Sequence, residues 1–159
     1  MPTDMFTLPQ AGIEDETRRF ITQQHGLIID GNRVPAAAGL TIDVFEPSSG
    51  KKLTTIAAAG PEDVEKAVRS ARKAFDKGPW PRMTPAEREL ILFRLADLIE
   101  ANKQVIAEIE TLDMGKPVLE ARDIDVMESA AYCRYMAGWA TKLDGRVTQL
   151  SAGPGNFGY

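Results

Sequence analysis

The residues best suited to nucleophilic chemistry are the only cysteine and the only histidine, Cys133 and His25. A Cys thiolate beside a His base is a recurrent catalytic pair. Cys133 falls within a helical pattern, between Tyr132 and Arg134, and neither a His nor a helix start lies beside it in sequence to activate its thiol. We therefore expect a packed, unreactive thiol at Cys133 and a boundary residue at His25, where a strand begins.

Two glycine segments have part of the spacing of phosphate-binding loops. The run Gly153-Pro154-Gly155-Asn156-Phe157-Gly158 matches G-x-G-x-x-G, but that motif needs a following helix and an acidic residue about 20 positions on, and only Tyr159 follows. We expect a turn there. Gly115-Lys116 lacks the first glycine and the hydroxyl of a P-loop, since Glu110 and Pro117 occupy those positions. A helix cap at Gly115 and a solvated cation at Lys116 are expected instead.

Carboxylates cluster at three places. Asp123 with Asp125, and the run from Glu14 to Glu16, are explained by solvated helix faces or caps. Asp113 differs because it precedes the helix end at Met114-Gly115, where free carbonyls and a carboxylate together suit a hard cation. One Cys and one His cannot form a zinc site. The residues alone therefore predict no catalytic centre.

Composition limits the partners and the compartment. The 159 residues include 19 Lys and Arg against 23 Asp and Glu, a net charge of -4, whereas nucleic-acid-binding domains are usually basic. No run approaches the roughly 20 apolar residues of a membrane span, and the start lacks a signal peptide. A lone Cys forms no internal disulfide, which fits a reducing compartment. We expect a cytoplasmic protein that binds neither nucleic acid nor membrane.

Short strands are expected near the start of the chain. Residues 1–12 indicate a loose arm and residues 13–24 a short helix. Leu27-Ile28-Ile29, Asp30-Gly31-Asn32 and Arg33-Val34 have the form of a tight hairpin. Residues 40–45 and 53–58 indicate two more strands, joined by the turn Glu46-Pro47-Ser48-Ser49-Gly50. Residues 26–59 are thus a small β region.

Helical periodicity begins at Gly60. The first helix starts at Pro61 and stops at Gly78-Pro79, and its apolar residues share one face: Val64, Ala67, Val68, Ala71, Ala74 and Phe75. Thr84 and Glu87 form a capping box that opens a second helix reaching about residue 101. A third covers about 103–113, and a long stretch covers 118–143, interrupted around 123–125. Strands at 147–150 and 157–159 follow, and we see no strands for the parallel sheet that such helices usually cover.

The order of these pieces resembles the start of the NAD(P)-dependent aldehyde dehydrogenases, from about residue 20 onward. The matching segments are Leu27-Ile28-Ile29-Asp30-Gly31-Asn32-Arg33-Val34, Glu46-Pro47-Ser48-Ser49-Gly50-Lys51, Ala59-Gly60-Pro61-Glu62-Asp63-Val64, Ala71-Arg72-Lys73-Ala74-Phe75, Trp80-Pro81-Arg82-Met83 with Glu87-Arg88, Glu110-Thr111-Leu112-Asp113-Met114-Gly115-Lys116-Pro117 and Tyr135-Met136-Ala137-Gly138-Trp139-Ala140. The last two are the most specific.

The resemblance implies an α/β, Rossmann-like aldehyde dehydrogenase fold, represented here by its N-terminal α+β portion: a small β region, four helices and a C-terminal hairpin. Residues 1–25 would be the arm and short helix, 26–144 the N-terminal part of the cofactor-binding domain, and 145–159 the start of the oligomerisation hairpin. The sheet would be encoded after Tyr159. We therefore expect a truncated product or part of a longer polypeptide.

The chemistry implied by the resemblance is oxidation of an aldehyde to a carboxylic acid, in which a Cys thiolate attacks the aldehyde and NAD or NADP accepts the hydride. In the family pattern the catalytic Cys, Glu and Asn and the cofactor-binding turn all lie beyond Tyr159. Cys133 matches none of them. We expect this chain alone to be inactive and to bind neither cofactor nor aldehyde.

The resemblance also implies a monovalent cation site formed by backbone oxygens of Val44 and Phe45 with Asp113. A further family ligand is absent, so we expect no occupancy in this chain. One alternative function is a non-catalytic interaction module, in which the terminal hairpin and uncovered helix faces pair with a second copy or with a full-length dehydrogenase. Another is an unrelated, independent α+β domain.

Overall fold

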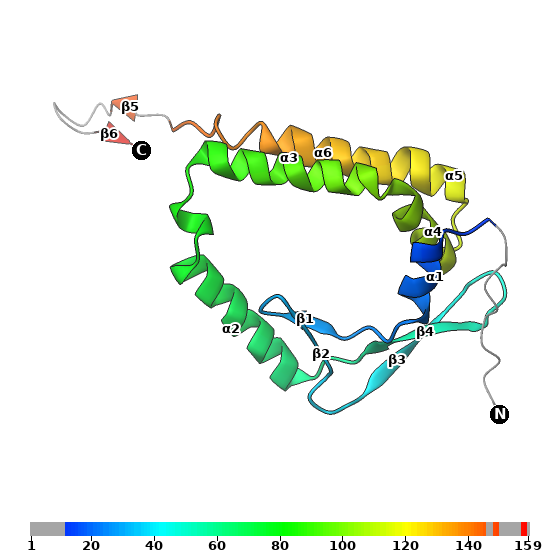
Figure 1. Cartoon of the computed structure of the whole chain (residues 1–159). Coiled ribbons are helices and arrows are strands. Elements are labelled where there is room, and N and C mark those ends of the chain that lie inside the picture. Colours follow the sequence, from blue (N-terminus) through cyan, green and yellow to red (C-terminus); the bar gives the residue numbers. More distant parts are fainter. Residues whose placement is uncertain (1–11, 146–147, 150–156, 159) are drawn as a thin grey trace.

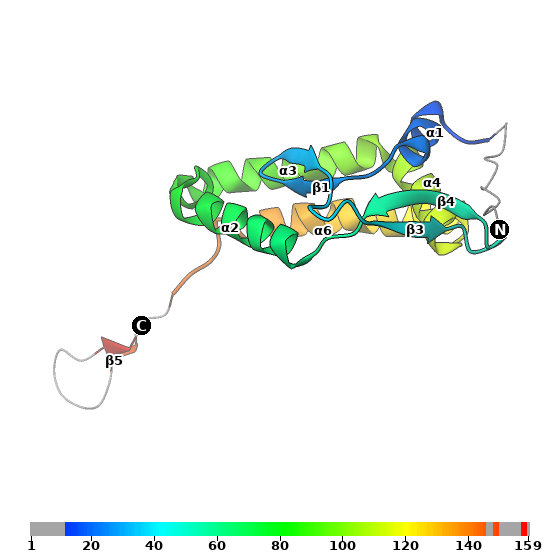
Figure 2. The same ribbon diagram turned by 90° about the horizontal axis from the view of Figure 1, so that it is seen from below.

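A computed structural model describes residues 12–145, 148–149 and 157–158. A short N-terminal helix and two β-hairpins lie on one side of the molecule, and longer helices form the rest (Figure 1). Seen from below, α3 (Pro85–Ala101) and α6 (Met127–Ala137) run side by side (Figure 2). None of the helices in the described ranges is long and apolar enough to cross a membrane.

The β region consists of two antiparallel hairpins. β1 (Leu27–Ile29) pairs with β2 (Asn32–Val34), and both turn residues have positive φ, 54° at Asp30 and 74° at Gly31. That pair of angles defines a type I′ turn, which matches the twist of the strands and confirms the predicted hairpin. β3 (Thr41–Phe45) pairs with β4 (Lys52–Ala57), and the register shifts between Val44 and Phe45.

An isolated β-bridge helps to join the N-terminal segment to the second hairpin. α1 (Asp15–Thr22) ends just before His25, which pairs in parallel with Ile56. The backbone N–H of His25 donates to the Thr55 carbonyl at 3.3 Å, and Ala57 donates back to the His25 carbonyl at 2.8 Å. His25 therefore lies at the boundary between two elements, as expected.

Local signals explain where the long helices begin and end. α2 (Pro61–Lys77) starts at Pro61 and stops at Gly78, where a Cβ would lie 2.2 Å from the Ala74 carbonyl oxygen. At α3, the Thr84 hydroxyl accepts the Glu87 N–H, and the Glu87 carboxylate accepts the Thr84 N–H, which confirms the capping box. The 3-10 turn η1 (Trp80–Arg82) connects the two helices.

The last helical segment departs from the predicted one. After α4 (Lys103–Met114), three segments form one continuous helical rod. They are α5 (Val118–Glu120), the π-helical turn η2 (Ala121–Val126) and α6. The expected interruption around residues 123–125 is thus a widened turn. The rod ends at Ala137 and not near Leu143, because the chain beyond it tightens into i→i+3 turns, such as Trp139 N–H to the Met136 carbonyl.

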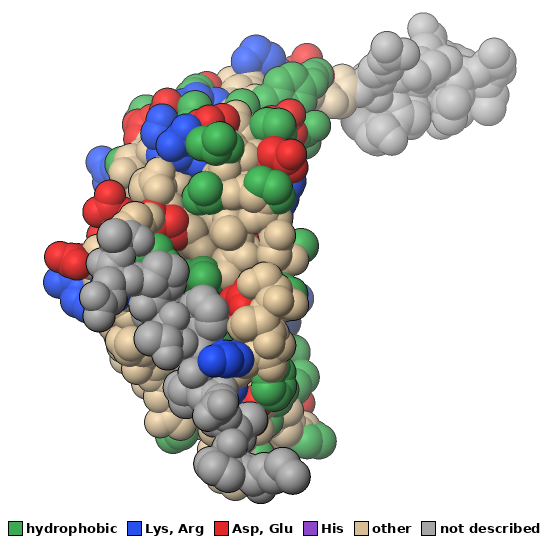
Figure 3. Space-filling model, turned by 90° about the vertical axis from the view of Figure 1, so that its right-hand side faces the viewer, with side chains coloured by type: hydrophobic (Ala, Val, Ile, Leu, Met, Phe, Trp, Pro, Cys, Tyr) green, Lys and Arg blue, Asp and Glu red, His purple; other side chains and the backbone are tan. Residues whose placement is uncertain are grey.

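The core is small for a chain of this length. One cluster contains Ile21, Leu53 and Leu112, and a second contains Ala107, Ala121 and Val126. The predicted apolar face of α2 is largely uncovered: Val64, Val68 and Phe75 are 54%, 59% and 60% exposed. Hydrophobic side chains also reach the surface among charged ones on the side that Figure 3 shows. Within the part of the chain that the structure describes, the apolar face of α2 is therefore without a packing partner over much of its length.

A terminal hairpin is present where the sequence predicts one. β5 (Thr148–Gln149) pairs antiparallel with β6 (Phe157–Gly158), beyond the end of the helices (Figure 1). Val147, Leu150, Tyr159 and the expected turn at 151–156, which contains most of the G-x-G-x-x-G spacing, lie outside the described residues.

Candidate functional site

The candidate cation residues lie where the end of β3 approaches the end of α4. α4 stops because Gly115 adopts a left-handed conformation, with φ at 78°. A Cβ at Gly115 would lie only 3.3 Å from Cγ of Pro47, in the turn after β3. Glycine is therefore required at Gly115 both for the helix cap and for this close approach.

The turn after β3 is built around the buried carboxylate of Glu46. It accepts the backbone N–H groups of Ser48 and Ser49, both at 2.8 Å, and the Ser49 hydroxyl at 2.5 Å. Hydrogen bonds from Ser48 and Ser49 lower the pKa of Glu46 from 4.5 to about 2. The carboxylate stays ionised at neutral pH and holds the turn after β3 in shape.

Two of the three candidate cation residues line one hollow of about 360 Å³. Val44 and Asp113 are on its wall, together with apolar side chains that include Leu53, Ile56 and Ile109, whereas Phe45 is not among the residues that line it. Hard cations bind six or more oxygens in many sites, whereas the side chains that line this hollow are mostly apolar and offer few oxygen ligands. Among the described residues, no three His, Cys, Asp or Glu side chains group to hold a metal. The site implied by the resemblance depends instead on backbone oxygens of Val44 and Phe45 together with Asp113.

The structure does not bring Cys133 and His25 together. The His25 ring packs on Phe20, with centroids 4.4 Å apart, and its Nε2 bonds to the Phe20 carbonyl oxygen at 2.8 Å. Cys133 is half-buried on α6, which packs along α3. No thiol–imidazole pair exists between them.

The paired carboxylates near residue 124 have different roles. Asp123 forms a bidentate ion pair with its neighbour Arg122, at 2.7 and 2.8 Å, and so remains at the surface. Asp125 pairs with Lys116 and also contacts Glu110. The expectation of a solvated cation at Lys116 is therefore wrong, because Asp125, the fifth residue of η2, forms an ion pair with it.

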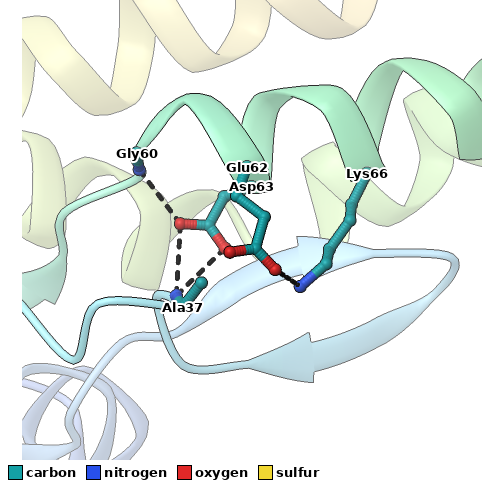
Figure 4. A network of polar contacts seen from close by, with 5 residues as sticks. All are labelled: Ala37, Gly60, Glu62, Asp63 and Lys66. Carbon is teal, nitrogen blue, oxygen red and sulfur yellow. Dashed lines mark hydrogen bonds and ion pairs between the residues drawn. The ribbon is translucent and has the colours of Figure 1, made fainter.

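Two buried carboxylates that the sequence does not single out join distant segments. Asp63 accepts the N–H of Ala37 and of Gly60, so it ties the loop after β2 to the start of α2 (Figure 4). Glu108 of α4 accepts the Thr17 hydroxyl at 2.5 Å and the Glu14 N–H at 3.0 Å. In the sequence, Asp63 is recognisable only as an acidic residue in the first turn of a helix. No neighbouring residue indicates that Glu108 forms a buried contact.

Most of the chain is similar to known proteins. Residues 34–159 match the model of the aldehyde dehydrogenase family. The chain is 43% identical over 144 residues to the putative aldehyde dehydrogenase DhaS of Bacillus subtilis (strain 168), covering 89% of this chain and 29% of that protein. It is 43% identical over 127 residues to the phenylacetaldehyde dehydrogenase of Pseudomonas fluorescens, covering 80% and 25%.

Solved structures of aldehyde dehydrogenases are also similar to this chain. The NAD⁺ complex of an aldehyde dehydrogenase from Bacillus cereus superposes with a TM-score of 0.85 at 36% identity, covering 89% of this chain and 29% of that one. An NAD-dependent aldehyde dehydrogenase from Sinorhizobium meliloti gives 0.77 at 41% identity, with 88% and 27% covered. The chain thus spans less than a third of the length of these proteins.

Proposed function

The chain belongs to the aldehyde dehydrogenase family, and we propose that it supplies the N-terminal scaffold of an enzyme that oxidises an aldehyde to a carboxylic acid while NAD accepts the hydride. The observation that carries this proposal is the family match over residues 34–159. The NAD⁺ complex of the similar Bacillus cereus enzyme supports NAD as the cofactor of the whole enzyme.

The role proposed for this chain is to pack against the rest of such an enzyme. The uncovered apolar faces support it, because Val64, Val68 and Phe75 of α2 and Leu90 and Leu98 of α3 are each more than half exposed. Several large apolar side chains exposed on the same helices are typical of an interaction surface. By itself the chain is then a scaffold whose contacts are incomplete.

We assign no catalytic step to the described residues. Cys133 has no imidazole or other base in contact with its thiol among them, and a nucleophilic thiol needs such support. Water, NAD⁺ and an aldehyde would yield a carboxylic acid, NADH and a proton only in the whole enzyme. We propose that this chain alone binds neither NAD nor NADP.

The division of the chain and its contacts are part of the same proposal. Residues 1–25 would form the arm, 26–144 the N-terminal part of the cofactor-binding domain and 145–159 a hairpin through which the enzyme self-associates; the open edges of β5 and β6 support this last point. Val44, Phe45 and Asp113 would hold a monovalent cation only when further oxygen donors complete the site. The lone Cys and the acidic composition support a cytoplasmic location.

An assay of the isolated chain tests the absence of catalysis. Purified chain is incubated with NAD⁺ or NADP⁺ and a panel of aldehydes, and cofactor reduction is followed by absorbance. We expect no turnover, with the same baseline for Cys133→Ser. Turnover that disappears in Cys133→Ser would contradict the proposal, because it would make Cys133 a nucleophile.

A further inference from the structure

The rod from Val118 to Ala137 is α-helical except over one π turn, Ala121–Val126. π-helical turns are rare, and they persist inside α-helices mainly as single turns, often at functional positions. The flanking residues on both sides are α-helical. Residues of the turn also contact elements outside the rod.

The two halves of the rod are anchored to different helices. On the N-terminal side, Ala121 and Val126 form a buried cluster with Ala107 of α4. On the C-terminal side, α6 packs along α3, and Arg134 binds Asp97 at 2.8 Å and Glu100 at 2.6 Å. The rotation of α6 relative to α4 is thus fixed at both ends.

That rotation depends on the π turn. A π turn contains about one residue more than an α turn, so relaxing it to α-helix would rotate α6 by about 100°, one residue's share of a 3.6-residue turn. Ser129 would then take the place of Ala130, and Met136 the place of Ala137. Both alanines are fully buried, so the larger side chains would overpack the contact with α3.

Asp125 is the residue of the π turn whose side chain forms an ion pair outside the rod. Its carboxylate pairs with Lys116, in the link between α4 and α5, and contacts the Glu110 side chain of α4. The Lys116 and Asp125 side chains are each 32% exposed, so the pair is partly shielded from water. Ser129 donates its hydroxyl to the Asp125 carbonyl at 2.8 Å, which satisfies a backbone oxygen of the widened turn.

We propose that the Lys116–Asp125 ion pair holds the π turn and thereby sets the rotation of α6 against α3. Lys116 and Asp125 are then positioning residues for the whole α3–α6 pair. Asp123 offers a matched comparison, because it lies in the same turn and its ion pair is with its neighbour Arg122, inside the rod.

Hydrogen exchange of the full chain tests this proposal. Asp125→Asn is expected to speed amide exchange across both η2 and α6, whereas Asp123→Asn leaves exchange in α6 unchanged. Lys116→Gln should reproduce the effect of Asp125→Asn. Equal effects of Asp123→Asn and Asp125→Asn, or none from either, would overturn the proposal.

A pair of single-residue deletions provides a second test. Deleting Ile124, which is 49% exposed, lets the rod become α-helical throughout while α6 keeps its rotation. Deleting the exposed Ala131 instead rotates everything after it. We expect the first deletion to preserve helicity and the unfolding temperature far better than the second, and to make Asp125→Asn nearly neutral. Equal losses from the two deletions, or an undiminished effect of Asp125→Asn, would contradict the proposal.

Discussion

The carboxylate of Asp63 binds the backbone N–H of Ala37 with both oxygens, at 3.0 and 3.2 Å, across 26 positions of sequence. The same carboxylate accepts the Gly60 N–H at 3.0 Å and is itself buried. A single side chain thereby joins the first hairpin to the start of α2.

Replacing Asp63 with Ala should weaken this junction. Ala37 and Gly60 then lose their bonds to a buried, charged acceptor, worth about 1.5–3 kcal/mol each, so unfolding in urea should shift to lower denaturant. Glu62→Gln is the control, because Glu62 pairs with Lys66 at the exposed surface (Figure 4) and such pairs contribute about 0–1 kcal/mol. Comparable losses in both variants would show that Asp63 is not the tie.

Glu46 should make stability depend on acid pH. Its pKa in the folded chain is about 2, below the 4.5 of the free group, so its contribution is present above pH 4.5 and is lost as the pH falls toward 2. Glu46→Gln should lower the unfolding temperature at pH 7 and reduce its dependence on pH over this window. An unchanged acid dependence in Glu46→Gln would contradict this assignment.

Glu110 should act in the opposite direction. Burial, and secondarily Asp125, raise the pKa of Glu110. Stability from the protonated group is therefore fully present below its unfolded value of 4.5 and is lost as the pH rises through the raised value. Glu110→Gln, which cannot ionise, should match the parent at pH 4 and have the higher urea midpoint at pH 8. A lower midpoint at pH 8 would contradict the sign of this effect.

The contact between Thr17 and Glu108 should hold α1 on α4. Thr17→Val leaves one bond of a buried carboxylate unmade, at a cost of about 1–3 kcal/mol, and should speed proteolysis within α1. Thr22→Val is the matched control, because the exposed Thr22 hydroxyl bonds only within its own helix. Equal cleavage rates in the two variants would exclude this role for Thr17.

Short-range chemistry explains which parts of the fold are predictable. Asp30-Gly31 and the Thr84–Glu87 box specify a turn and a helix start with neighbouring residues alone, and both are present. The Glu108–Glu14 bond joins residues 94 positions apart, so no local pattern reports it. The π turn was expected only as an interruption, because the contact that holds Asp125 comes from outside the rod.

Local sequence patterns predict only part of the candidate site. The helix end at Gly115 is predicted from a glycine after an apolar run, and it places Asp113 beside Val44. Phe45 follows Val44 on β3 and is not among the residues that line that hollow, since neighbouring strand residues face opposite sides. The register shift between these two residues has no signature in the alternation of residues.

As the proposed N-terminal scaffold of an aldehyde dehydrogenase, this chain should work in place of the matching segment of a relative. The direct measurement exchanges the matching segment of the Pseudomonas fluorescens phenylacetaldehyde dehydrogenase for this chain and follows NADH formation with phenylacetaldehyde. We predict a soluble hybrid that reduces NAD⁺, and a loss of that activity when Val64 and Val68 are both changed to Asp. A hybrid without turnover, beside an active parent enzyme, would contradict the claim.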